Sequence, residues 1–69
     1  MNELQILLNS EKEILEKQIT ISEFLLAKGL NPETIIVEYN GKILKKQEWS
    51  EIELQDQDQL EVLNFVGGG

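Results

Sequence analysis

Apolar and polar residues alternate in three stretches of the chain, at 3–9, 34–39 and 59–66. This alternation is typical of β-strands, because successive side chains of a strand point to opposite faces of the sheet. A fourth stretch, 12–18, places two apolar residues among charges, as an edge strand does, and it follows the turn-forming residues Asn9–Ser10. We therefore expect at least four strands, with a hairpin at the start of the chain.

Residues 20–30 follow a helical period instead. Thr20 and Glu23 have the spacing of a capping box, in which each side chain bonds a backbone N–H that the first helical turn leaves unpaired. Gly29 supplies the left-handed residue that commonly ends a helix, and Pro32 prevents its continuation. We predict a helix of about two to three turns with one apolar face. The residues of that face are Ile21, Phe24 and Leu25.

The second half of the chain combines a hairpin with an irregular connection. The dipeptide Asn40–Gly41 tolerates the positive φ angles of a two-residue type I′ turn, so it predicts a hairpin. Residues 45–54 follow neither period, and we expect a short helical turn there, with Trp49 as a lid on the core rather than a ligand-stacking residue. Residues 55–59 are polar and predict a solvated turn before the last strand.

A helix laid across one face of the sheet would divide the strand residues into a core face and an open face. The residues predicted for the core are Leu4, Ile6, Leu8, Val37, Tyr39, Leu44, Leu60 and Val62, with Ile21, Phe24 and Leu25 from the helix. The residues predicted for the open face are Gln5, Leu7, Ile36, Glu38, Glu61, Leu63 and Phe65. Several large apolar side chains on a solvent face indicate a surface for docking a partner protein.

Composition removes most of the chemistry that a small domain could perform. The chain has 69 residues, enough for one domain with a modest core, and it contains neither Cys nor His. Thiol nucleophiles, imidazole bases, disulfides and zinc fingers are therefore excluded. The net charge of −7 disfavours nucleic acid and anionic membranes as partners and favours a basic protein surface. Because no apolar run reaches membrane-spanning length and the start lacks signal-peptide features, we expect a cytoplasmic protein.

The order of elements is that of an α+β fold, with one main helix packed across a mixed sheet of four to five strands. This is the β-grasp, or ubiquitin-like, arrangement. The segments "LQILLN", "NGK" and "EW" followed by "LQDQDQLEVLNFVGGG" then make the chain resemble the ThiS family over essentially its whole length. One departure is visible, because members commonly carry Asp-Gly-Asp where this chain has Asp56, Gln57 and Asp58. A positive φ at that glycine would be costly for Gln57.

The resemblance implies a sulfur carrier protein that serves as a cosubstrate of other enzymes and has no catalytic residue of its own. In such a carrier the last glycine, here Gly69, is adenylated and converted to a thiocarboxylate that donates sulfur for the thiazole moiety of thiamine. Gly68 and Gly69 match the family's di-glycine, and Gly67 adds reach. We therefore expect a β-grasp domain at 1–66 and a flexible tail at 67–69.

The resemblance also implies three protein partners: an adenylating enzyme, a thiazole synthase and a sulfur-donating protein. ATP and magnesium would belong to the adenylating enzyme, so we expect this chain to bind no cofactor and no metal. Asp56 and Asp58 have no third ligand in their turn and are predicted to be turn formers. The residues expected to meet the partners are Leu7, Ile36, Leu63 and Phe65, with Glu38 and Glu61 facing basic groups.

Three alternatives remain open from the sequence. The small subunit of molybdopterin synthase has the same fold and tail, although it is usually longer, so the length of this chain and its Trp49 favour the thiamine pathway. A ubiquitin-like protein modifier, conjugated through Gly69 to a lysine, would have a similar sequence pattern. A plain interaction module with an inert tail is the third alternative.

Overall fold

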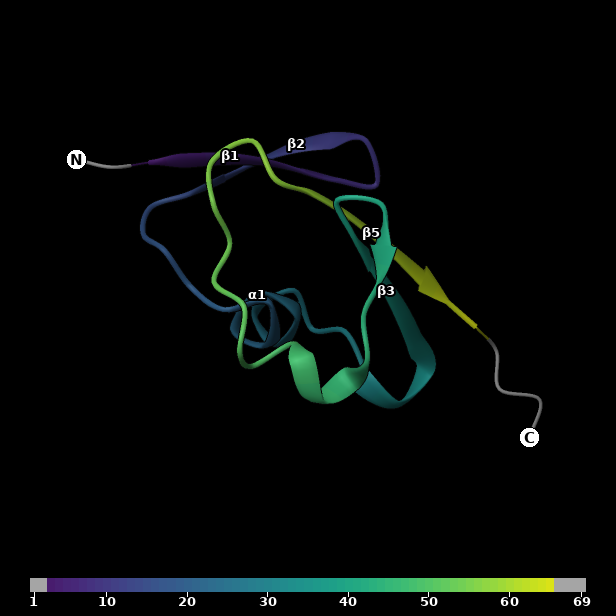
Figure 1. Ribbon diagram of the computed structural model, residues 1–69. Helices are drawn as coiled ribbons and strands as arrows, with labels where there is room; N and C mark the ends of the chain where they lie inside the picture. The colour runs from purple at the N-terminus through teal and green to yellow at the C-terminus, as the bar shows by residue number, and fades with distance from the viewer. Residues whose placement is uncertain (1–2, 66–69) are drawn as a thin grey trace.

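A mixed five-stranded sheet with one α-helix against one of its faces makes up the fold in the computed structural model, which describes residues 3–65 (Figure 1). The strand order is β2-β1-β5-β3-β4, in which β1 and β5 are parallel and the other neighbours are antiparallel. The predicted α+β architecture is confirmed, with five strands. The elements in chain order are β1 (Leu4–Leu8), β2 (Glu11–Leu15), α1 (Ile21–Ala27), the 3₁₀ turn η1 (Pro32–Thr34), β3 (Ile35–Tyr39), β4 (Lys42–Ile43), the 3₁₀ turn η2 (Lys46–Glu48) and β5 (Gln59–Asn64).

Both ends of α1 are fixed by local hydrogen bonds. The Glu23 backbone N–H donates to Thr20 Oγ1 at 3.0 Å, and the Thr20 backbone N–H donates to Glu23 Oε1 at 2.9 Å, so the predicted capping box is confirmed. Gly29 has φ 76° after the helix, and the Leu30 N–H donates to the Leu25 carbonyl at 3.1 Å. These bonds satisfy groups that the helix ends would otherwise leave unpaired. The helix has 7 residues, at the short end of the prediction.

The two hairpins have turns with left-handed backbone. Asn40 and Gly41 have φ 48° and 90°, as the predicted type I′ turn requires. Asn9 and Ser10, between β1 and β2, have φ 51° and 70°. The hairpin predicted at the start of the chain is confirmed, with β2 at the sheet edge.

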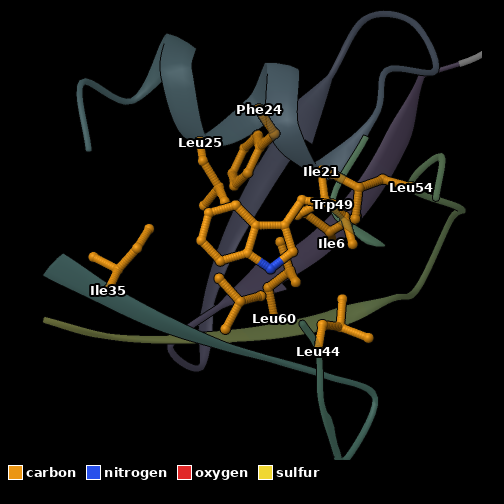
Figure 2. Packing of buried hydrophobic residues seen from close by; sticks show 10 residues of the cluster. Ile6, Ile21, Phe24, Leu25, Ile35, Leu44, Trp49, Leu54 and Leu60 are labelled. Atoms are coloured by element: carbon orange, nitrogen blue, oxygen red, sulfur yellow. The ribbon is translucent and has the colours of Figure 1, made fainter. Parts of the chain in front are cut away.

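Buried side chains from α1, the sheet and the β4–β5 connection form a single core. Figure 2 shows the indole of Trp49 between Phe24 and Leu25 of α1 and Leu60 of the sheet. Trp49 is 5% exposed, so its predicted place in the core is confirmed. The buried hydrophobic residues are Ile6, Ile21, Phe24, Leu25, Ile35, Val37, Leu44, Trp49, Leu54 and Leu60.

The core differs from the prediction at several positions. Ile35 is buried although it was not among the predicted core residues, and Leu8, Tyr39 and Val62 are only partly buried. Leu4 is only half-buried, because β5 begins to pair with β1 at Leu7 and leaves the start of β1 near the edge of the sheet. Leu54 is fully buried, although its polar sequence neighbours gave no sign of a core position. Its backbone N–H donates to the carbonyl of Ile19 at 2.8 Å, which holds the connection against the start of α1.

The turn before β5 is solvated only in part, and the prediction is wrong for Asp58, which is 8% exposed. Its carboxylate accepts hydrogen bonds from the Tyr39 hydroxyl at 2.7 Å, Asn40 Nδ2 at 3.1 Å and the Gln55 backbone N–H at 2.8 Å. Such bonds offset the cost of burying a carboxylate. Asp58 therefore connects the β3–β4 hairpin to the start of β5.

The remaining turn residues attach the same loop to β1. The Gln5 backbone N–H donates to Asp56 Oδ1 at 2.8 Å, and this bond lowers the pKa of Asp56. The Gln57 N–H donates to the Gln5 carbonyl at 2.6 Å. Gln57 has φ 75°, so the turn keeps the left-handed conformation suited to glycine even though glycine is absent.

Replacing the strained residue of this turn should stabilise the domain. We expect Gln57→Gly to raise the free energy of unfolding by about 1 kcal/mol, because a left-handed L-residue costs more than the added backbone entropy of glycine. Gln55→Gly is the matched control, since Gln55 is exposed and is not among the positive-φ residues. It should be neutral or destabilising. Urea denaturation measures both, and a loss of stability in Gln57→Gly would contradict the strain.

Tyr39 should remain protonated to unusually high pH. Burial, followed by the hydrogen bond to Asp58, raises the pKa of Tyr39 from 10.0 to about 12. Because the unfolded chain releases this proton near its ordinary pKa, the stabilisation is complete below about pH 10 and is lost as pH rises through the folded-state value. Tyr39 is the single tyrosine, so phenolate absorbance follows it directly. A midpoint near 10 in the folded protein would contradict the prediction.

Candidate docking face and the end of the last strand

The β3–β5 pairing places the predicted docking residues on the sheet face away from α1, which we call the open face. Ile36 lies directly opposite Leu63, and Glu38 lies directly opposite Glu61. The residue between the β3 pair, Val37, is fully buried in the core. Alternation therefore directs these four side chains to the open face, as the sequence predicted.

Large apolar side chains are exposed on this face. Leu63 is 64% exposed, Ile36 is 40% exposed and Phe65 is 42% exposed, so their predicted exposure is confirmed and Phe65 is not part of the core. Ile43 of β4 is 67% exposed and lies opposite Glu38. Together with the β1–β2 turn these strands form a shallow groove of about 510 Å³, the open-face groove. It is lined by Asn9, Ser10, Ile36, Glu38, Ile43, Glu61, Val62 and Leu63.

The sequence analysis groups Leu7 with Ile36, Leu63 and Phe65 as one docking surface, but Leu7 does not line this groove, and its expected place beside Leu63 is wrong. Leu7 is paired with Gln59, four positions before Leu63 on β5. At a strand rise of about 3.3 Å per residue, that register places Leu7 roughly 13 Å along the strand from Leu63. The β1–β2 turn occupies the space beside the later part of β5, where the Val62 N–H donates to Asn9 Oδ1 at 2.8 Å.

Ile43 was missed by the sequence analysis, although a signal for it was present. In a hairpin with a two-residue turn at Asn40–Gly41, counting back from the turn pairs residue 39 with 42 and residue 38 with 43. The structure has this register. Asn9 and Ser10 had no comparable signal, because their place in the groove depends on how β1 and β5 are aligned.

The ladder of β5 continues one residue beyond the strand. Asn64 is paired with Ile35, and the Phe65 N–H donates to the Thr34 carbonyl at 2.8 Å. Phe65, which is the last residue described, is thereby attached to the segment that precedes β3. The residues predicted to form the tail and its reactive end lie outside the described residues; they are Gly67, Gly68 and Gly69.

The charged residues that line the open-face groove, Glu38 and Glu61, are both acidic. The ion pairs within residues 3–65 are Lys28 with Glu13 and Lys46 with Glu33, and neither includes a carboxylate of the open face. Lys28 and Glu13 lie 2.9 Å apart (Nζ to Oε2).

A second, smaller groove lies between α1, η1 and η2. It has a volume of about 270 Å³ and is mainly apolar, and its most exposed apolar residue is Leu26, at 64%. Its lining is Ser22, Leu25, Leu26, Leu30, Pro32, Lys46, Trp49 and Ser50. The sequence analysis did not identify it, because Leu26 lies beside the core face of α1 and was not given a role.

Possible metal ligands are dispersed in the described part of the chain. Within residues 3–65 no group of three or more Asp or Glu residues is arranged to hold a metal ion. Asp58 uses its carboxylate for hydrogen bonds within the domain. No helix among these residues combines the length and the apolar character needed to cross a bilayer.

Comparison with known proteins gives consistent relatives. The ThiS family model matches residues 1–69. The sulfur carrier protein ThiS of Bacillus subtilis is 42% identical over 50 residues, which cover 72% of this chain and 76% of that protein. A thiazole synthase of Magnetococcus marinus is 35% identical over 66 residues, which cover 96% of this chain. The chain spans only 20% of the length of that synthase.

Solved structures have the same fold. The crystal structure of the thiamine biosynthesis protein ThiS from Geobacter metallireducens matches with a TM-score of 0.83 and 26% identity, over 96% of this chain and 100% of that one. The solution structure of the Geobacter metallireducens protein gives a TM-score of 0.79. Since the family model spans the whole chain, and a carrier sequence and a thiamine biosynthesis structure agree with it, the chain belongs to the ThiS family of sulfur carriers in thiamine biosynthesis.

Proposed function

We propose that the chain carries sulfur on the carboxyl group of Gly69 and delivers it for formation of the thiazole moiety of thiamine. The observation that carries this proposal is the family match over residues 1–69, which includes the two last glycines. The fold supports it, because β5 leads directly from the open face towards those glycines. In this role the chain is a cosubstrate, and the catalytic groups belong to its partners.

The chemistry explains why a partner and ATP are needed. A terminal carboxylate is ionised at neutral pH, with a pKa near ~3.5 for such groups, and resists attack by a nucleophile. When its oxygen attacks the α-phosphate of ATP, pyrophosphate leaves and an acyl adenylate forms. Hydrosulfide released from the sulfur donor then attacks the acyl carbon, the C–O bond to AMP breaks, and the thiocarboxylate forms. One carboxylate oxygen leaves with AMP and sulfur takes its place.

Glycine suits the segment that must enter the partner's site. Without Cβ atoms, a glycine run can pass through a channel too narrow for other residues. The three glycines span at most about 10 Å when extended. The hydrogen bond between Phe65 and Thr34 fixes the point from which this reach is measured.

The proposed partners are an adenylating enzyme that holds ATP and magnesium, a thiazole synthase and a sulfur-donating protein. Two thiazole synthases, from Magnetococcus marinus and Paramagnetospirillum magneticum, contain a region similar to this chain. A carrier-like region within the same polypeptide stays close to the synthase that uses it. These two relatives therefore support thiazole synthase as a binding partner of this chain. We also propose that the carrier is cytoplasmic, because the ATP needed for its activation is available there.

Intact-mass measurement tests the proposal. The chain is incubated with the host's adenylating enzyme, ATP and a sulfur donor. We expect its intact mass to rise by the difference between one sulfur atom and one oxygen atom. Subsequent transfer to thiazole synthase, and not to molybdopterin synthase, assigns the pathway. Adducts of higher mass with other proteins would support a protein modifier, and an unchanged mass would contradict a carrier.

Removing the reactive end should abolish function without affecting the fold. We expect deletion of Gly69, or Gly68→Leu, to eliminate acyl-adenylate formation, measured as ATP-pyrophosphate exchange. The deletion shortens the reach of the carboxylate, and the leucine adds a side chain that a channel fitted to glycine excludes. Circular dichroism and thermal unfolding should match those of the unmodified chain. Retained exchange after deletion of Gly69 would exclude its proposed role.

A charge on the open face should weaken docking. We expect Leu63→Asp to raise the dissociation constant for the adenylating enzyme at least tenfold, because burying such a side chain contributes about 1.5–3 kcal/mol and the new carboxylate must be desolvated.

Leu26→Asp is the matched control for this variant, since Leu26 is also 64% exposed but lies on the other side of the molecule. It should bind like the unmodified chain. Titration calorimetry measures both variants. Equal losses in the two, or normal binding by Leu63→Asp, would show that the partner uses another surface.

A further inference from the structure

Two carboxylates face each other across the β3–β5 ladder. The Asn40 N–H donates to the Gln59 carbonyl at 2.8 Å, and the Phe65 N–H donates to the Thr34 carbonyl at 2.8 Å. Because hydrogen-bonded pairs recur at every second position of an antiparallel ladder, Glu38 and Glu61 also form such a pair. Their Cα atoms are therefore about 5.5 Å apart, and their side chains share the open face.

The neighbours of this pair on β3, β4 and β5 are apolar, whereas Asn9 and Ser10 make the groove polar at the β1–β2 turn. Ile43 lies opposite Glu38 on the other side of β3, and Ile36 and Leu63 form the next open-face pair of the ladder. All of them line the open-face groove. Like charges placed directly opposite on neighbouring strands destabilise a sheet. Within residues 3–65, neither ion pair of the structure involves these carboxylates.

We propose that the open-face groove receives one arginine side chain of the adenylating enzyme, whose guanidinium bridges Glu38 and Glu61. This inference rests on the proposed carrier function. A planar guanidinium presents several N–H donors in a fixed fork and is weakly hydrated, so it can span two carboxylates and lie against apolar side chains. Ile36, Ile43 and Leu63 provide those apolar contacts.

The position of the groove agrees with this occupant. Leu63 lies two residues before Phe65, where β5 leaves the sheet towards the glycines. A partner that docks here is therefore adjacent to the segment it must receive. A second copy of the chain cannot supply the guanidinium, because the six basic residues of the sequence are all lysines.

Binding measurements with neutral variants test the proposal. We expect Glu38→Gln and Glu61→Gln each to weaken binding to the adenylating enzyme by roughly tenfold and to reduce its dependence on sodium chloride. Glu51→Gln makes the same change of charge at an exposed position after η2 and should change affinity less than about twofold. Equal effects in all three variants would indicate net charge alone and overturn the proposal.

The double variant distinguishes one shared cation from two separate ones. If a single guanidinium bridges both carboxylates, the two positions are coupled, and the loss of affinity in Glu38→Gln combined with Glu61→Gln should differ from the product of the two single losses. Losses that multiply would show two independent cations and overturn the bridging arginine. Replacing each arginine of the enzyme's docking surface in turn should identify one whose loss makes the chain insensitive to Glu38→Gln.

The free domain gives a readout that needs no partner. Because removal of one carboxylate relieves the repulsion, Glu38→Gln and Glu61→Gln should each raise the melting temperature by about 1–5 °C. Glu51→Gln should leave it unchanged. A fall or no change in the first two variants would overturn the premise of an uncompensated pair.

Failure of this inference can be separated from failure of the carrier function. At saturating adenylating enzyme, the Gln variants should still form the thiocarboxylate, because Gly69 is unchanged. A chain that gains no sulfur under those conditions would contradict the carrier function itself. If the chain gains sulfur and the Glu38→Gln variant binds with normal affinity, only the arginine site is contradicted.

Discussion

The antiparallel pairing of β5 with β3 is the interaction on which the rest of the structure depends. β5 lies in the middle of the sheet, between β1 and β3, and its register with β3 runs from Ile35 opposite Asn64 to Tyr39 opposite Leu60. This alignment directs Leu60 to the core and the neighbouring open-face residues to solvent. A slip of one residue would exchange the two faces, so the same register determines both the core and the composition of the open face.

Polar contacts fix this register at both ends of β5. At its start, the Gln59 N–H donates to Asn40 Oδ1 at 2.8 Å, and the buried carboxylate of Asp58 accepts the Tyr39 hydroxyl. At its end, Phe65 is hydrogen-bonded to Thr34. Phe65, the last described residue, is consequently held at a defined position relative to the open face. A partner that recognises this face therefore meets the end of β5 in a defined place.

Local signals were sufficient for the helix caps and for the Asn40–Gly41 turn, because each depends on residues close together in the sequence. The burial of Leu54 and Asp58 could not be read in this way, since it is created by the return of the chain beneath α1 and beside the β3–β4 hairpin. The alternation on β1 identified the face of Leu7 correctly, but alternation does not specify the alignment of two parallel strands. The distance between Leu7 and Leu63 could therefore be determined only from the structure.

Side-chain alternation in the sequence predicts the open face, but it does not identify the partner that binds there. Side-chain alternation shows which residues are exposed, whereas the proposed occupant is inferred from the cross-strand neighbours Glu38 and Glu61. The family relationship adds the chemistry of the terminal glycine, which no packing argument provides.

Methyl NMR of the chain bound to its adenylating enzyme tests the central claim, that β3 and β5 present the docking surface together with the base of the tail. With Ile and Leu methyls labelled, the account predicts large shift changes or broadening for Ile36, Ile43 and Leu63 and little change for Leu26. The reverse pattern, with Leu26 perturbed and the three open-face methyls unchanged, would contradict it.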